Sequence, residues 1–103
     1  MQLCVIEGDG VGHEVVPAAV RVLKSLIPNL QLFPAEAGFE CLVRWGTPLP
    51  EETIALATRY RAVLFGAAES PSYHVEGYFS PIISLRQKLL TYANVRPTRD
   101  MPV

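Results

Sequence analysis

Two arginines near the C-terminal end of the sequence, Arg86 and Arg96, are the side chains best suited to bind a charged substrate. Arginine keeps its positive charge at physiological pH, and its planar guanidinium group binds a carboxylate through two parallel hydrogen bonds. Taken singly, each would more often be an ordinary surface residue. A helix-to-strand connection that brought the two together would favour a substrate with more than one carboxylate.

The residues before Arg86 predict the helix that carries it. Ser80 and Pro81 are typical of an N-cap and a first helical position. Ile83 precedes Arg86 by three residues, so the two would share one face of this helix. If Arg86 binds a carboxylate, Ile83 would lie beside the neighbouring substituent of the substrate and would help to select it. A second stripe is expected to face the core, and it consists of Ile82, Leu85 and Leu89.

A glycine-rich turn, residues 8–14, follows the first apolar run. A turn of this kind between a strand and a helix invites comparison with the dinucleotide-binding fingerprint GxGxxG. The last glycine of that fingerprint would fall at position 13, which is His13 in this chain. Glu36, after the second apolar run, could imitate the acid that binds the ribose. The broken glycine pattern nevertheless favours a tight turn that needs glycine for steric reasons over an ordinary Rossmann site.

A second run of small residues, 66–71, follows the apolar segment 62–65. Open α/β sheets usually bind ligands just beyond the carboxyl ends of their strands. Within this run, the hydroxyl group of Ser70 could donate a hydrogen bond to a carboxylate. The alternative is a serine in an exposed turn before Pro71, and the run taken alone favours this alternative.

The apolar pattern predicts alternating strands and helices. Strands are expected at 3–6, 30–33, 62–65 and 92–95, and helices at 13–26, 39–45, 51–60 and from 81 onward, with a loop over 67–79. This order is typical of an α/β fold with a largely parallel sheet flanked by helices. Parallel strands are usually covered on both faces, and the helices here are few. We therefore expect residues 1–103 to form a single, incomplete domain.

Composition excludes several classes of protein. Half of the 103 residues are hydrophobic and 18% are charged, as in globular proteins. The net charge of −1 gives no basic surface for nucleic acid. No apolar run is long enough to span a bilayer, and the first residues do not form a signal peptide. Cys4 and Cys41 lack zinc-site spacing, as do His13 and His74, so we expect no metal site, a buried thiol at Cys4 and a cytoplasmic protein.

Three segments together resemble the β-decarboxylating dehydrogenases, the family of isocitrate, isopropylmalate, tartrate and homoisocitrate dehydrogenases. They are residues 6–15 (IEGDGVGHEV), 64–71 (LFGAAESP) and 85–97 (LRQKLLTYANVRP). The first and second, with Ala35-Glu36-Ala37-Gly38, look most like members that act on homoisocitrate in lysine biosynthesis. The resemblance implies a partial isopropylmalate dehydrogenase-like fold, in which residues 1–103 are the N-terminal part of the large domain.

The resemblance also implies a reaction: oxidation of a di- or tricarboxylic 2-hydroxy acid by NAD, then loss of the β-carboxylate with the help of Mg²⁺ or Mn²⁺. Arg86 and Arg96 match the two arginines that hold the carboxylates of the malate moiety, and Ser70 matches a loop serine near the variable substituent. Ile83 is aliphatic, which suits isopropylmalate, or homoisocitrate recognised mainly through Ser70. The positions expected near the nicotinamide half of NAD are Ala68, Glu69 and Ser70, with Val11 a weaker candidate.

The family pattern is incomplete in this chain. Its third arginine, its general-acid tyrosine, the lysine from a neighbouring subunit of the homo-oligomer and its metal-binding aspartates have no counterpart before Val103. General acid–base catalysis needs a positioned proton carrier, and metal-assisted decarboxylation needs acidic ligands. We therefore expect no catalytic residue here and no activity from the chain alone. The alternatives are a non-catalytic truncated relative that binds or assembles with a full-length subunit, and an ordinary Rossmann dehydrogenase, which His13 disfavours.

Overall fold

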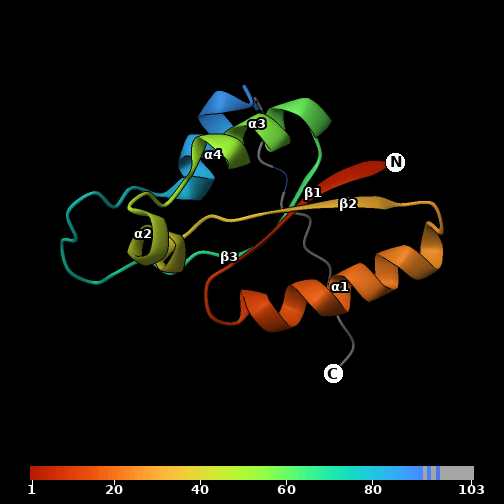
Figure 1. Cartoon of the computed structure of the whole chain (residues 1–103), viewed down its shortest axis with the longest axis horizontal. Helices are drawn as coiled ribbons and strands as arrows, with labels where there is room; N and C mark the ends of the chain where they lie inside the picture. Colours follow the sequence, from red (N-terminus) through yellow and green to blue (C-terminus); the bar gives the residue numbers. More distant parts are fainter. Residues whose placement is uncertain (92, 94, 96–103) are drawn as a thin grey trace.

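The computed structural model describes residues 1–91, 93 and 95, and within them three parallel strands and four helices form an α/β fold (Figure 1). The predicted order of elements is confirmed, with ends shifted by at most two residues, except for the strand expected at 92–95. The elements are β1 (Gln2–Gly8), α1 (Gly12–Leu26), β2 (Gln31–Ala35), α2 (Phe39–Trp45), α3 (Glu51–Tyr60), β3 (Val63–Ala67) and α4 (Pro81–Lys88).

The strand β1 lies in the centre of the sheet, with the strand order β2-β1-β3. Both pairings are parallel, so the predicted parallel sheet is confirmed. All three strands therefore point their carboxyl ends toward the same edge, where the connections to α1, α2 and the loop after β3 emerge. This edge is the expected place for a ligand in an open parallel sheet.

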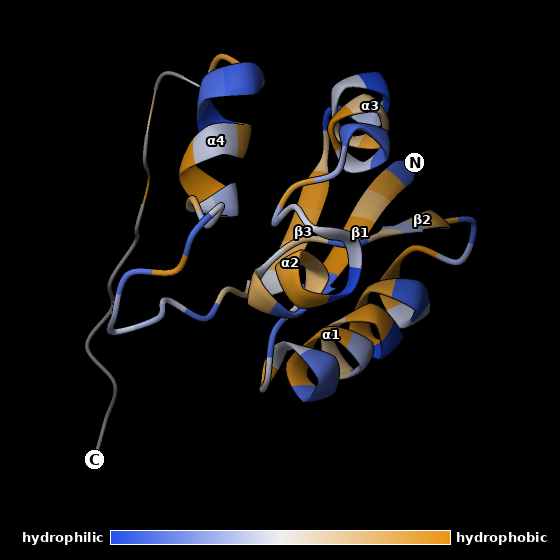
Figure 2. Cartoon of the chain, turned by 60° about the vertical axis from the view of Figure 1, so that its left-hand side comes forward, coloured by the Kyte–Doolittle hydropathy of each residue, from blue (hydrophilic) through white to orange (hydrophobic). Residues whose placement is uncertain are grey.

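Alternating side chains of β1 build two separate cores, because successive residues of a strand face opposite sides of a sheet. Leu3 and Val5 pack with α1 on one face. Cys4 and Ile6 pack on the other face with side chains from α3 and α4, including Leu85. Figures 1 and 2 show α1 below the sheet and α3 above it. The predicted buried thiol at Cys4 is confirmed, and Cys41 is buried as well.

The strand expected at 92–95 is not formed at its described residues. Ala93 and Val95 have no regular secondary structure, and the side chain of Val95 is 80% exposed. Tyr92 and Asn94 lie outside the described residues. The apolar character of this run suited a strand, but apolar residues form a strand only where a neighbouring strand can pair with them.

Gly8 explains why the first turn needs glycine. It has a φ of +79°, which disfavours residues with a Cβ atom. A Cβ atom at this position would also lie 1.9 Å from the backbone oxygen of Ala67. The steric interpretation of this glycine is therefore confirmed, since β1 and β3 approach each other too closely here for any side chain.

The N-cap of α4 leads to a first prediction. The Ser80 hydroxyl accepts a hydrogen bond from the backbone N–H of Ile83 at 3.3 Å, which confirms the expected cap. Replacing Ser80 with alanine should lower the free energy of unfolding by about 1 kcal/mol, because this helical N–H loses its partner. Urea unfolding followed by circular dichroism would measure the change. The matched control is Ser84→Ala within the same helix, which should be neutral, and equal losses in both variants would argue against the cap.

Candidate functional site

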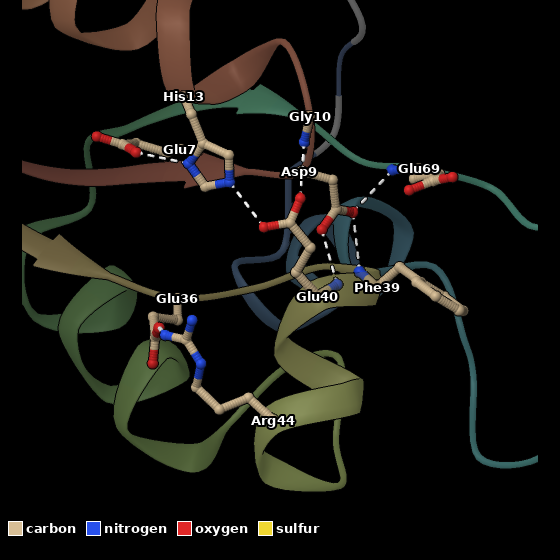
Figure 3. A network of polar contacts seen from close by, with 9 residues as sticks. All are labelled: Glu7, Asp9, Gly10, His13, Glu36, Phe39, Glu40, Arg44 and Glu69. Atoms are coloured by element: carbon tan, nitrogen blue, oxygen red, sulfur yellow. Dashed lines mark hydrogen bonds and ion pairs between the residues drawn. The ribbon is translucent and has the colours of Figure 1, made fainter.

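A buried carboxylate, that of Asp9, organises the carboxyl edge of the sheet (Figure 3). Asp9 is 2% exposed, and its carboxylate accepts three backbone hydrogen bonds, each 2.8 Å long. The N–H groups of Phe39 and Glu40 donate from the first turn of α2, and that of Glu69 donates from the loop after β3. A buried charge is tolerated only when it is fully hydrogen-bonded. Asp9 thus joins the glycine turn, α2 and the loop after β3.

The Asp9 carboxylate caps the N-terminus of α2. Its N-cap residue is Gly38, which has no side chain to cap the helix, so Asp9 takes that role from 30 residues away. Negative charge at a helix N-terminus is favourable because the first N–H groups carry partial positive charge. A Cβ atom on Gly38 would lie 2.5 Å from Asp9 Oδ2. Glycine is required at this position so that the carboxylate can reach the helix.

A second set of polar side chains contacts the same turn on its solvent side. His13 Nδ1 lies 2.7 Å from Glu7 Oε1, and His13 Nε2 lies 2.7 Å from Glu40 Oε1. The other oxygen of Glu40 accepts the backbone N–H of Gly10 at 2.9 Å. The hydrogen bonds to Glu7 and Glu40 raise the pKa of His13 above its ordinary value of 6.5. The Gly10 N–H and then His13 lower the pKa of Glu40 below 4.5.

The structure brings the two predicted cofactor segments close together. The Asp9 N–H donates to the Ala67 oxygen at 2.8 Å, so the turn that carries Val11 is bonded directly to the start of the 68–70 loop. Val11 is 59% exposed, and Glu69 and Ser70 are exposed. A hollow of about 190 Å³ beside this loop is lined by Phe39, Glu69, Ser70, Pro71, Ser72 and Tyr73. Both segments therefore lie at the carboxyl edge of the sheet, and their hydrogen bonds to Asp9 and Ala67 anchor them to each other.

The helix α4 presents the predicted substrate face. Ile83 is 55% exposed, Arg86 is exposed, and the two lie one turn apart. Leu85 is buried in the core and fixes the helix from its other side. Arg96, the second predicted carboxylate ligand, lies outside the described residues. Within the described part of the chain, no hydrogen bond or ion pair joins Arg86 to Ser70, so the predicted substrate residues occupy two separate segments.

The edge of the sheet near β2 differs from an ordinary dinucleotide site. Glu36 follows β2, and its carboxylate accepts hydrogen bonds from Arg44 at 2.9 Å and from the Trp45 indole at 2.6 Å. The hollow beside it has a volume of about 260 Å³ and is also lined by Glu7 and Glu40. The same hollow is lined by the basic residues His13 and Arg44, but both are paired with these three carboxylates, so the excess charge facing a nucleotide phosphate would be negative. The arrangement therefore argues against the ordinary Rossmann alternative.

Neither a metal site nor a reactive thiol is present in the described part of the chain. Among residues 1–91, 93 and 95, no group of three histidine, cysteine, aspartate or glutamate side chains could hold a metal ion. Burial raises the pKa of both the Cys4 and the Cys41 thiol, which makes each less reactive. No helix in this region is both long and apolar enough to cross a membrane.

Comparison with known proteins finds relatives from one enzyme family over nearly the whole chain. The family model described as isocitrate/isopropylmalate dehydrogenase matches residues 2–103. An isocitrate/homoisocitrate dehydrogenase of Thermus thermophilus is 51% identical over 102 residues, which are 99% of this chain and 30% of the relative. A homoisocitrate dehydrogenase of Methanocaldococcus jannaschii is 46% identical over an alignment of 104 positions, which covers 100% of this chain and 30% of the relative.

Among solved structures, a β-decarboxylating dehydrogenase from Thermococcus kodakarensis in its apo form superposes with a TM-score of 0.79 and 40% identity. The superposition covers 88% of this chain and 27% of that one. The chain thus spans about 30% of the length of the curated relatives it matches. The fold described above is one part of a larger fold in these relatives.

Proposed function

The chain belongs to the isocitrate/isopropylmalate dehydrogenase family, and from that premise we propose that it forms the N-terminal segment of an NAD-dependent enzyme that oxidises and decarboxylates homoisocitrate. Membership of this family supports the oxidation and β-decarboxylation of small hydroxy acids as the reaction of the complete enzyme. The choice of homoisocitrate rests on the two relatives named for it. Isopropylmalate and isocitrate are the competing substrates. The complete enzyme is proposed to be a cytoplasmic homo-oligomer.

The observation that carries the proposal is the exposed pair Ile83 and Arg86 on α4. A guanidinium group on a capped helix that the buried Leu85 anchors is preorganised to hold a carboxylate, which lowers the entropic cost of orienting the substrate. Arg86 and Arg96 would hold the carboxylates of the malate moiety. Ile83 and Ser70 would contact its variable substituent.

The cofactor would lie along the carboxyl edge of the sheet. When bound there, NAD supplies the acceptor for a hydride from the hydroxyl-bearing carbon of the substrate. Val11, Ala68, Glu69 and Ser70 would contact the nicotinamide half. Asp9 would hold these two segments at a fixed separation, because it accepts the Glu69 N–H and lies two residues from Val11.

The metal of the family has no ligand set among the described residues, so we assign no step through it. The proton carrier that the family pattern requires also has no counterpart in this sequence. We therefore propose that the chain binds and orients its ligands only together with further protein, and that it is inactive alone.

The first experiment is to measure the mass of the native protein with an antibody against its first residues. A mass several-fold above 11.4 kDa supports an N-terminal segment, and the whole protein is then assayed with homoisocitrate, isopropylmalate and isocitrate. We expect NAD-dependent formation of reduced nicotinamide, with the highest kcat/KM for homoisocitrate. Absence of activity with all three acids and either NAD or NADP would contradict the proposal.

A second candidate is a non-catalytic partner that assembles with a full-length subunit. It is favoured by a row of exposed apolar side chains at the N-cap of α1 and along this helix, namely Val11, Val15, Val22 and Leu26. Such a row is typical of a surface that another polypeptide covers. A native mass near 11.4 kDa, together with co-purification of a full-length family member, would support this candidate over the first.

A further inference from the structure

The contacts of His13 define its protonation state. Both ring nitrogens lie 2.7 Å from carboxylate oxygens, Nδ1 from Glu7 and Nε2 from Glu40. An ionised carboxylate can only accept hydrogen bonds, and a neutral imidazole carries only one N–H. Both bonds can form together only if both nitrogens are protonated. With both carboxylates ionised, the two distances are therefore those of an imidazolium ion (Figure 3).

This ion joins three elements of the fold. His13 lies in the first turn of α1, Glu7 in β1 and Glu40 in the first turn of α2. Glu40 extends the contact to the glycine turn, because its second oxygen accepts the Gly10 N–H at 2.9 Å. These bonds lie on the solvent side of Asp9, which holds the same turn and the same helix from within.

From this geometry we propose that His13 is a pH-sensitive clamp that holds the glycine turn against α2 in its imidazolium form and releases one carboxylate when it loses a proton. After deprotonation, one ring nitrogen would present a lone pair to a carboxylate oxygen at 2.7 Å, and this contact is repulsive. The proposal concerns the fold and does not depend on the proposed enzymatic function.

The charged surroundings favour the protonated state. The remaining titratable groups that line the hollow beside His13 are Glu36, which follows β2, and Arg44 and Cys41 on α2. Arg44 is paired with Glu36, which weakens its repulsion of a positively charged His13. Because the hydrogen bonds to Glu7 and Glu40 raise the pKa of His13, its stabilising contribution is complete below the ordinary value of 6.5. That contribution is lost as the pH rises through the raised value.

The test is an NMR titration of the isotope-labelled chain between pH 5 and 9. The ring nitrogen shifts of His13 should indicate an imidazolium ion at pH 6.5, and its midpoint should lie above the ordinary histidine value of 6.5. The amide signal of Gly10 should titrate with the same midpoint, because Glu40 contacts both groups. An unmoved Gly10 signal would show that the turn does not sense His13.

Variants separate the clamp from a general surface effect. Glu7→Gln and Glu40→Gln should each lower the His13 midpoint. The matched control is Glu14→Gln, an exposed carboxylate in the same turn of α1, which should leave it nearly unchanged. If the variants do not fold, the ring nitrogen shifts of the wild-type chain alone test whether His13 is an imidazolium ion. A neutral ring at pH 6.5, or equal midpoints in all variants, would overturn the proposal.

Discussion

Replacing Asp9 with alanine is expected to lower the free energy of unfolding by about 3–5 kcal/mol, because each of three partly buried N–H groups loses its acceptor at a cost of about 1–3 kcal/mol. Water that enters the vacated space would hydrogen-bond to some of these N–H groups, so the expected loss is smaller than the sum of the three full costs. This loss is a large fraction of the stability of a small domain. Urea unfolding followed by circular dichroism would measure it.

Two variants isolate the role of the carboxylate. Asp9→Asn keeps the shape but turns an N–H₂ group toward at least one donor, so its loss should be smaller than that of alanine. Glu69→Ala removes an exposed side chain and keeps the backbone N–H that Asp9 accepts. It should change stability by less than about 0.5 kcal/mol. A loss below about 1 kcal/mol in Asp9→Ala would contradict the central role of this carboxylate.

The sequence could predict most of the elements because their causes are local. An apolar run such as 62–65 ends in glycine, and the Ser80-Pro81 pair marks a helix start that neighbouring residues alone determine. The parallel arrangement followed from the alternation of strands and helices, since two neighbouring parallel strands need a crossover between them. The expected strand at 92–95 had no such support, because pairing depends on a partner that a local pattern does not reveal.

The polar groups of the site were harder to predict because their partners are distant in sequence. Asp9 bonds to residues 30, 31 and 60 positions away, and His13 bonds to Glu40 27 positions away. The sequence showed only that His13 lacks zinc-site spacing, whereas the structure pairs it with Glu7 and Glu40. The available signal was an acidic residue between two glycines directly after a buried strand. A buried carboxylate at such a turn must find several donors, and the nearest N–H groups are those of helices and loops at the same edge.

The second large effect is expected in the complete enzyme, where Arg86→Ala should lower kcat/KM for homoisocitrate by about 10²- to 10³-fold. Truncating one partner of a desolvated charge pair costs about 2–5 kcal/mol, and each 1.4 kcal/mol is about tenfold in rate. The side chain is exposed in this structure, so the stability of the variant should hardly change. Steady-state kinetics with homoisocitrate and NAD, beside an unfolding curve, would separate the two effects.

The geometry of α4 supplies the controls for this prediction. Arg86→Lys keeps the charge but loses the two-pronged geometry, so it should recover only part of the activity. Lys88 is also in the last turn of α4, and two residues correspond to about 200° around a helix, which places it on the opposite face from Arg86. Lys88→Ala should leave kcat/KM unchanged. If both alanine variants lose activity equally, the effect comes from the net charge of the helix, and Arg86 does not bind the substrate carboxylate.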